Sequence, residues 1–199
     1  MNLLVGLTAA QVDEALAVAI FSERAAGRPV YAIPDEDAMA AVADHLGVPV
    51  PQARGLLLRT ASVQISDAGG WHRPFATLAR NLGDASTTSL DTPPGLAAIA
   101  VLSLAADSMH AAEGMAAHNY YGRLHALLDT PEDSKKAVEG GYREHGEELW
   151  DALNAWLEAW EGERGIPTAY VVGTMDTLAW LCRKRWSDAP TGRSFLGFS

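Results

Sequence analysis

Apolar residues recur at three- and four-residue spacing through most of the chain, in segments that glycine and proline separate. This spacing is typical of helices that bury one face. Thr8 and Gln11 form a capping-box pattern at the start of the first segment, and Asp35 can cap the second. In the first part of the chain the pattern predicts four helices, at residues 9–26, 35–46, 52–64 and 74–82, the last closed by Gly83.

The most apolar segment, residues 96–106, is apolar on nearly every side of a helix. Such a helix is usually buried in the centre of a fold. Thr92 can cap it and Pro93 can occupy its first turn, so the central helix is expected from Pro93 to about Met109. A glycine in a helix interior costs about 1 kcal/mol relative to alanine, so Gly114 and Gly122 are expected to interrupt any continuation.

The last part of the chain shows three further helical segments. Thr130 and the residues after it form a capping signal for a short helix, which is expected to stop at Gly140 and Gly141. A Trp-rich helix is expected at residues 142–160, with leucine and tryptophan on one face and carboxylates mostly off it. A final helix is expected at residues 174–186, and these last two helices are expected to pack on the central one.

These segments predict an all-α fold, a mostly helical, bundle-like array with at most one short two-stranded β element. The candidate strands are residues 30–33 and 168–173. The polar loop at residues 86–89 is the expected internal boundary. It divides the chain into a small N-terminal helical subdomain, residues 1–85, and a helical core region, residues 86–199, with the central and Trp-rich helices.

Composition narrows the classes of function. The one cysteine, Cys182, excludes an internal disulfide and favours a cytoplasmic protein, and the abundant alanine favours a bacterial source. The apolar runs are too short to cross a bilayer, so we expect no membrane partner. The net charge of −10 argues against a general affinity for nucleic acid, except through the basic residues Arg183, Lys184 and Arg185.

Two groups of residues could carry out metal chemistry. Asp107, His110 and Glu113 are spaced three residues apart, and this spacing places successive ligands on neighbouring positions of a helix. His145 and Glu148, also three apart, could complete the site, which would hold a divalent transition metal. The alternative interpretation is that all five are polar groups at the rim of a helical bundle, because no HExxH or CxxC motif accompanies them.

Two surfaces could bind another protein. Between Glu132 and Arg164, ten carboxylates stand against four basic residues, which predicts an acidic face. Tyrosine and arginine offer large contact areas with directional polar ends, so the segment from 118 to 125 is the other candidate. Its tyrosines are otherwise explained as buried side chains. The residues of this second surface are His118, Asn119, Tyr120, Tyr121, Arg123 and His125.

The segments HNYYGRL, from His118, and ELWDALNAWL, from Glu148, resemble N-terminal helical regions of large bacterial proteins, some of them linked to phage defence. The resemblance spans roughly residues 95–180 and assigns no catalytic residue. It implies a non-catalytic interaction or assembly module without a cofactor, bound to a protein partner or to the remainder of a larger polypeptide. A metal-dependent hydrolase or oxidase is the alternative, so enzymatic activity stays an open question.

Overall fold

A computed structural model describes residues 7–20, 34–66, 70–86, 92, 94–107 and 117–164 of the chain. Within these ranges the chain is helical and forms no β-strand, which confirms the predicted all-α fold class. The candidate strands at residues 30–33 and 168–173 and the predicted helix at residues 174–186 lie outside the described residues. No helix in the described ranges is both long enough and apolar enough to span a membrane.

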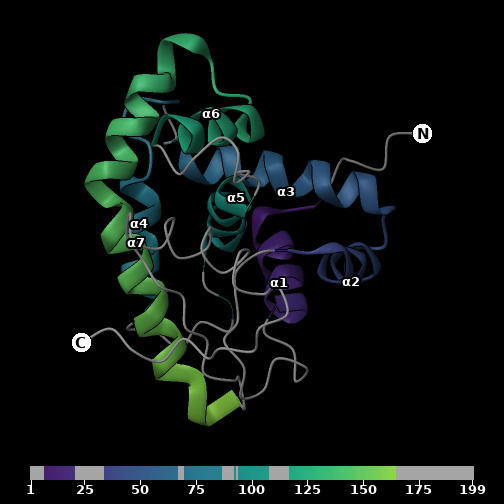
Figure 1. The fold of residues 1–199 in the computed structure, drawn as a ribbon. Coiled ribbons are helices and arrows are strands. Elements are labelled where there is room, and N and C mark those ends of the chain that lie inside the picture. The colour runs from purple at the N-terminus through teal and green to yellow at the C-terminus, as the bar shows by residue number, and fades with distance from the viewer. Residues whose placement is uncertain are drawn as a thin grey trace, which may run out of the picture.

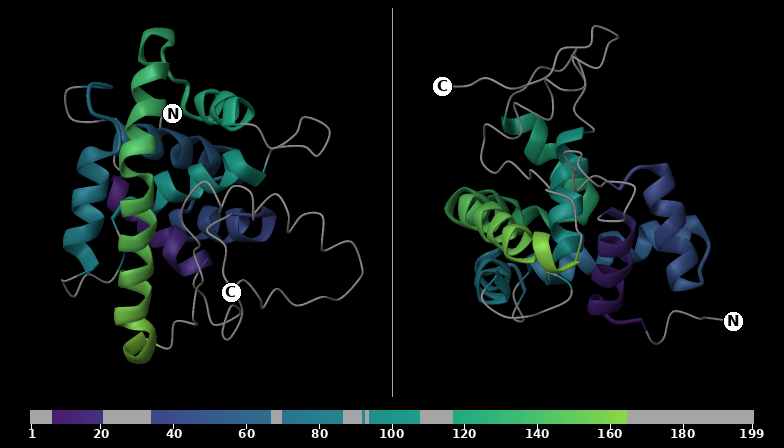
Figure 2. Two further views of the ribbon diagram at one scale, coloured as in Figure 1. Left: turned by 60° about the vertical axis from the view of Figure 1, so that its left-hand side comes forward. Right: turned by 90° about the horizontal axis from the view of Figure 1, so that it is seen from below.

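Figure 1 shows α5 in the middle of the array, with α4 and α7 on one side and α1 and α2 on the other. In Figures 1 and 2, α7 runs lengthwise beside α4. The elements in chain order are α1 (Ala9–Ile20), α2 (Glu36–Leu46), α3 (Val50–Ile65), α4 (Ala76–Ser86), α5 (Leu96–Asp107), α6 (Ala117–Leu128), the 3₁₀ helix η3 (Glu132–Ser134) and α7 (Lys135–Arg164).

Helix α2 begins and ends where the sequence indicates. The Asp35 side chain accepts a hydrogen bond from Ala38 N at 2.8 Å, as expected of an N-cap. At the other end Gly47 adopts a left-handed conformation with φ 65°, and Val48 N donates to Ala43 O at 3.0 Å. These contacts satisfy backbone groups that the helix leaves unpaired at its ends, so local residues are sufficient to set its limits.

Helix α5 is the predicted central helix, and it is buried on nearly all sides. Every residue from Leu96 to Ser103 is buried, as are Ala105 and Ala106. The helix begins at Leu96, later than the expected start at Pro93, and ends at Asp107. The expected cap was Thr92, but the side chains that accept hydrogen bonds from the first turn come from two other helices.

Asp13 of α1 and Gln64 of α3 cap the N-terminus of α5. Asp13 Oδ2 accepts a hydrogen bond from Gly95 N and Oδ1 accepts one from Ala97 N, both at 2.9 Å. Gln64 Oε1 accepts from Ala98 N at 3.0 Å, and Gln64 Nε2 donates to Asp13 Oδ2 at 2.8 Å. Burial raises the pKa of Asp13, while its three N–H donors lower it. This network joins three helices at the centre of the fold.

The predicted break at Gly140 and Gly141 is wrong, because α7 continues from Lys135 to Arg164 as one helix. A Cβ atom on Gly141 would lie 2.3 Å from Pro74 O, so this glycine lets α7 approach the backbone that precedes α4. Tertiary packing offsets the low helix propensity of glycine. Gly83 lies inside α4 and does not close that helix, and Gly122 lies inside α6 and does not interrupt it, both contrary to the expectation. Gly114, the other expected interruption, lies outside the described residues.

The packing partners of the central helix and the Trp-rich helix also differ from the expectation. Most contacts of α7 are with α4, whereas α5 packs on α3, α6 and α1. One apolar core includes buried residues from every α-helix, on both sides of residue 85. The two segments that the sequence divides at this point therefore share one core in the described residues.

Candidate functional site

The six α6 residues of the candidate recognition surface differ in how far they are buried. Tyr120, Tyr121 and His125 are only 1%, 7% and 8% exposed. His118 is exposed, while Asn119 and Arg123 are half-buried. The two tyrosines and His125 therefore pack inside the fold, and the accessible part of this surface is smaller than the sequence indicates.

The buried tyrosines belong to an aromatic cluster that joins α6, α7 and the loop before α4. The rings of Phe75 and Tyr142 lie 5.4 Å apart, and the Tyr120 ring lies 5.8 Å from Tyr142 and 5.4 Å from Tyr121. Phe75 is fully buried although its φ of 73° is unfavourable for a bulky residue. The burial of this ring against Tyr142 offsets a backbone strain of about 1–3 kcal/mol.

Two hydroxyl groups of this cluster have different surroundings. Tyr142 Oη accepts a hydrogen bond from Trp150 Nε1 at 3.1 Å, in a buried position. Tyr120 Oη is buried and makes no well-formed hydrogen bond within the part of the chain that the structure describes, although besides burial its interaction with the nearby Tyr142 hydroxyl raises the pKa of Tyr120. Removal of a buried partner costs more than removal of a buried group that has no partner.

We expect Tyr142→Phe to lower the free energy of unfolding by about 1–3 kcal/mol, because it leaves the buried Trp150 N–H without an acceptor. Tyr120→Phe is the matched control, since it removes the same atom from the same cluster. It is expected to leave the free energy of unfolding unchanged or slightly higher. Urea unfolding followed by circular dichroism measures both. Equal losses in the two variants would contradict this assignment of hydrogen bonds.

Burial raises the pKa of Tyr120, Tyr121 and Tyr142, and the Trp150 N–H partly opposes this effect at Tyr142. A pKa that is higher in the folded than in the unfolded chain means that stability is full below the unfolded value, about 10, and falls as the pH rises past it. We expect the phenolate absorbance of Tyr120, isolated as wild type minus Tyr120→Phe, to rise only together with the loss of helical circular dichroism. Ionisation of this phenol in the helical state would refute the expectation.

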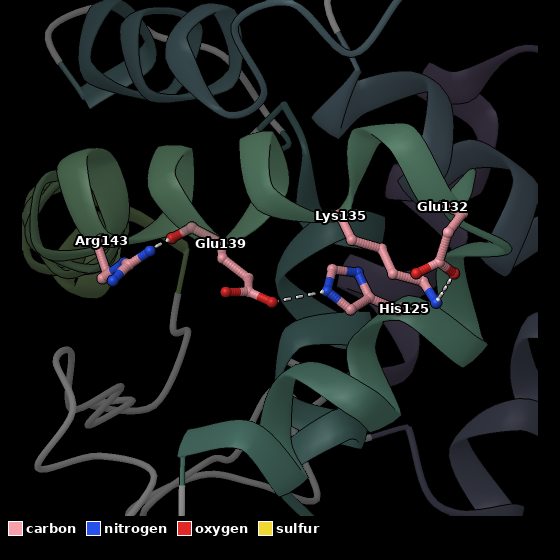
Figure 3. A network of polar contacts seen from close by, with 5 residues as sticks. All are labelled: His125, Glu132, Lys135, Glu139 and Arg143. Atoms are coloured by element: carbon pink, nitrogen blue, oxygen red, sulfur yellow. Dashed lines mark hydrogen bonds and ion pairs between the residues drawn. The ribbon is translucent and has the colours of Figure 1, made fainter.

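His125 lies at the corner between α6 and α7, where Figure 3 shows a network of polar contacts. Its Nε2 lies 3.4 Å from Glu139 Oε1, and Arg143 Nε donates to Glu139 O at 3.2 Å. The His125 ring stacks on the Tyr121 ring at a centroid distance of 6.4 Å. The backbone oxygen of His125 accepts a hydrogen bond from Thr130 N at 3.1 Å. These contacts hold the corner together and leave little of the ring accessible to a substrate.

The structure brings together two of the five proposed metal ligands. His145 Nδ1 lies 3.4 Å from Glu148 Oε2 on α7, in agreement with their three-residue spacing. Asp107 is the half-buried last residue of α5, and His110 and Glu113 lie outside the described residues. Among the residues that are described, no group of three or more His, Cys, Asp or Glu side chains could hold a metal ion. Asp107 therefore does not form such a group with His145 and Glu148.

Four carboxylates of the acidic segment form an exposed face on α7. They are spaced three, four and seven residues apart, which places them on one side of the helix. Leu149 and Leu153 on the opposite side are fully buried. The side chains of this acidic face are Glu144, Glu147, Glu148 and Asp151, and all four are exposed. The basic residues Arg183, Lys184 and Arg185 lie outside the described part of the chain.

Asp13, a buried carboxylate that accepts three hydrogen bonds in the described part of the chain, was not among the residues predicted from the sequence. Its position could have indicated that it is buried. Leu16 and Ile20, three and seven residues further on, lie on the same side of α1 and are buried. A carboxylate on an apolar face needs buried hydrogen-bond donors.

Comparison with models of protein families, with curated proteins and with solved structures finds no match for this chain.

Proposed function

We propose that this chain is a non-catalytic helical interaction module, and that it binds a basic surface of a partner protein through the acidic face of α7. The observation that carries this proposal is the exposure of Glu144, Glu147, Glu148 and Asp151 on the side opposite the core. The net charge of −10 adds a long-range attraction for basic partners.

The charge pattern of this face supports a binding role. Like charges three or four residues apart destabilise a helix by about 0.2–0.5 kcal/mol per pair. The face contains four such pairs, 144/147, 144/148, 147/151 and 148/151. His145 lies beside Glu144 and Glu148, at 3.9 and 3.4 Å, and relieves the repulsion only when it is protonated. A partner with lysine or arginine side chains would relieve all four repulsions and would be guided to the face by its charge.

The buried residues that could carry out acid–base chemistry have a structural explanation instead. Three tyrosines and His125 are buried in or beside the aromatic cluster, where they pack α6 against α7. Their position supports a role in stability. The exposed side chains of the acidic face are charged, and complementary charges are a means of recognition between proteins.

The test compares two variants that lose the same charge. The first variant neutralises the acidic face by Glu144→Gln, Glu147→Gln, Glu148→Gln and Asp151→Asn. The control neutralises four exposed carboxylates of α1 and α2 by Glu14→Gln, Glu36→Gln, Asp37→Asn and Asp44→Asn. Each is used as bait beside the wild type, with quantitative mass spectrometry of the proteins retained and mapping of chemical cross-links.

We expect the wild type and the control to retain a common partner cross-linked to α7, and the acidic-face variant to lose it at least about tenfold, a change of about 1.4 kcal/mol. Raised salt is expected to weaken binding of the wild type, because exposed charges are screened. Unchanged retention by the acidic-face variant, with its helical content intact, would refute the proposal. Equal losses in both variants would show a dependence on net charge alone.

The α6 surface is tested in the same assay by His118→Ala, Asn119→Ala and Arg123→Ala together. Tyr120 and Tyr121 are left in place, because their replacement would disturb the core. We expect this variant to retain the partner. Its loss, with the acidic-face variant unaffected, would move the interface from α7 to α6.

A further inference from the structure

We draw no further inference here: the strongest candidate, the buried polar atoms Tyr120 Oη, His125 Nδ1 and Thr130 Oγ1 around the α6–α7 corner, carries nothing, because five residues separate the first two and turn them to different sides of α6, and the described residues show no ligand position that the three share.

Discussion

Asp13→Asn is expected to lower the free energy of unfolding by about 2–4 kcal/mol, although the side chain keeps its size and shape. Both carboxylate oxygens accept hydrogen bonds, Oδ1 from Ala97 N and Oδ2 from Gly95 N and Gln64 Nε2. An asparagine has only one acceptor, so its NH₂ group would face at least one N–H donor at close range. The variant would therefore leave buried donors at the first turn of α5 without a partner.

The loss has a second physical cause. The first N–H groups of a helix carry a partial positive charge, and a carboxylate at this position interacts favourably with it. Asparagine has no net charge and gives up most of this interaction. Because the bonded groups belong to α1, α3 and α5, the damage affects the contact of three helices and not one helix end.

Glu14→Gln is the matched control for this experiment. It changes the neighbouring residue from carboxylate to amide, but Glu14 is exposed, so the free energy of unfolding is expected to change by less than about 0.5 kcal/mol. Urea unfolding at neutral pH measures both variants. If Asp13→Asn costs no more than Glu14→Gln, then Asp13 does not cap α5 in the way described.

Gly141→Ala is expected to destabilise the protein by about 1–3 kcal/mol or more, as overpacking in a core does. A Cβ atom at this position would lie 2.3 Å from Pro74 O and 3.2 Å from Pro74 C. Both atoms belong to the backbone, which cannot rotate away as a flexible side chain can. Helix α7 would have to shift away from the loop before α4, and the Phe75–Tyr142 contact next to it would loosen.

Gly140→Ala distinguishes this steric effect from helix propensity, because it makes the same substitution one residue earlier in α7. Nothing lies within 4 Å of a Cβ atom on Gly140. Alanine is expected to stabilise the helix there by about 0.5–1 kcal/mol. The two variants should therefore change the thermal midpoint in opposite directions. A gain in both would show that α7 does not approach Pro74 this closely.

In the candidate site, residue spacing predicts some features and tertiary packing decides others. The three-residue spacing of His145 and Glu148 predicted their proximity, and the charge of the segment predicted an acidic face. The burial of Tyr120 and Tyr121 was one of two open interpretations. A tyrosine fits both a binding surface and a core, so the choice depends on Phe75 and Tyr142, which come from elsewhere in the chain.

By itself the sequence determined the all-α class, the limits of α2 and the burial of α5, because periodicity, caps and composition act within one helix. Only the tertiary structure decided that α7 runs through Gly141 and that Asp13 caps α5. The first outcome depends on Pro74, which lies 67 residues before Gly141 in the chain. The second depends on Gly95, which lies 82 residues after Asp13. Local propensities of about 1 kcal/mol are smaller than the packing and buried hydrogen bonds that such distant contacts supply.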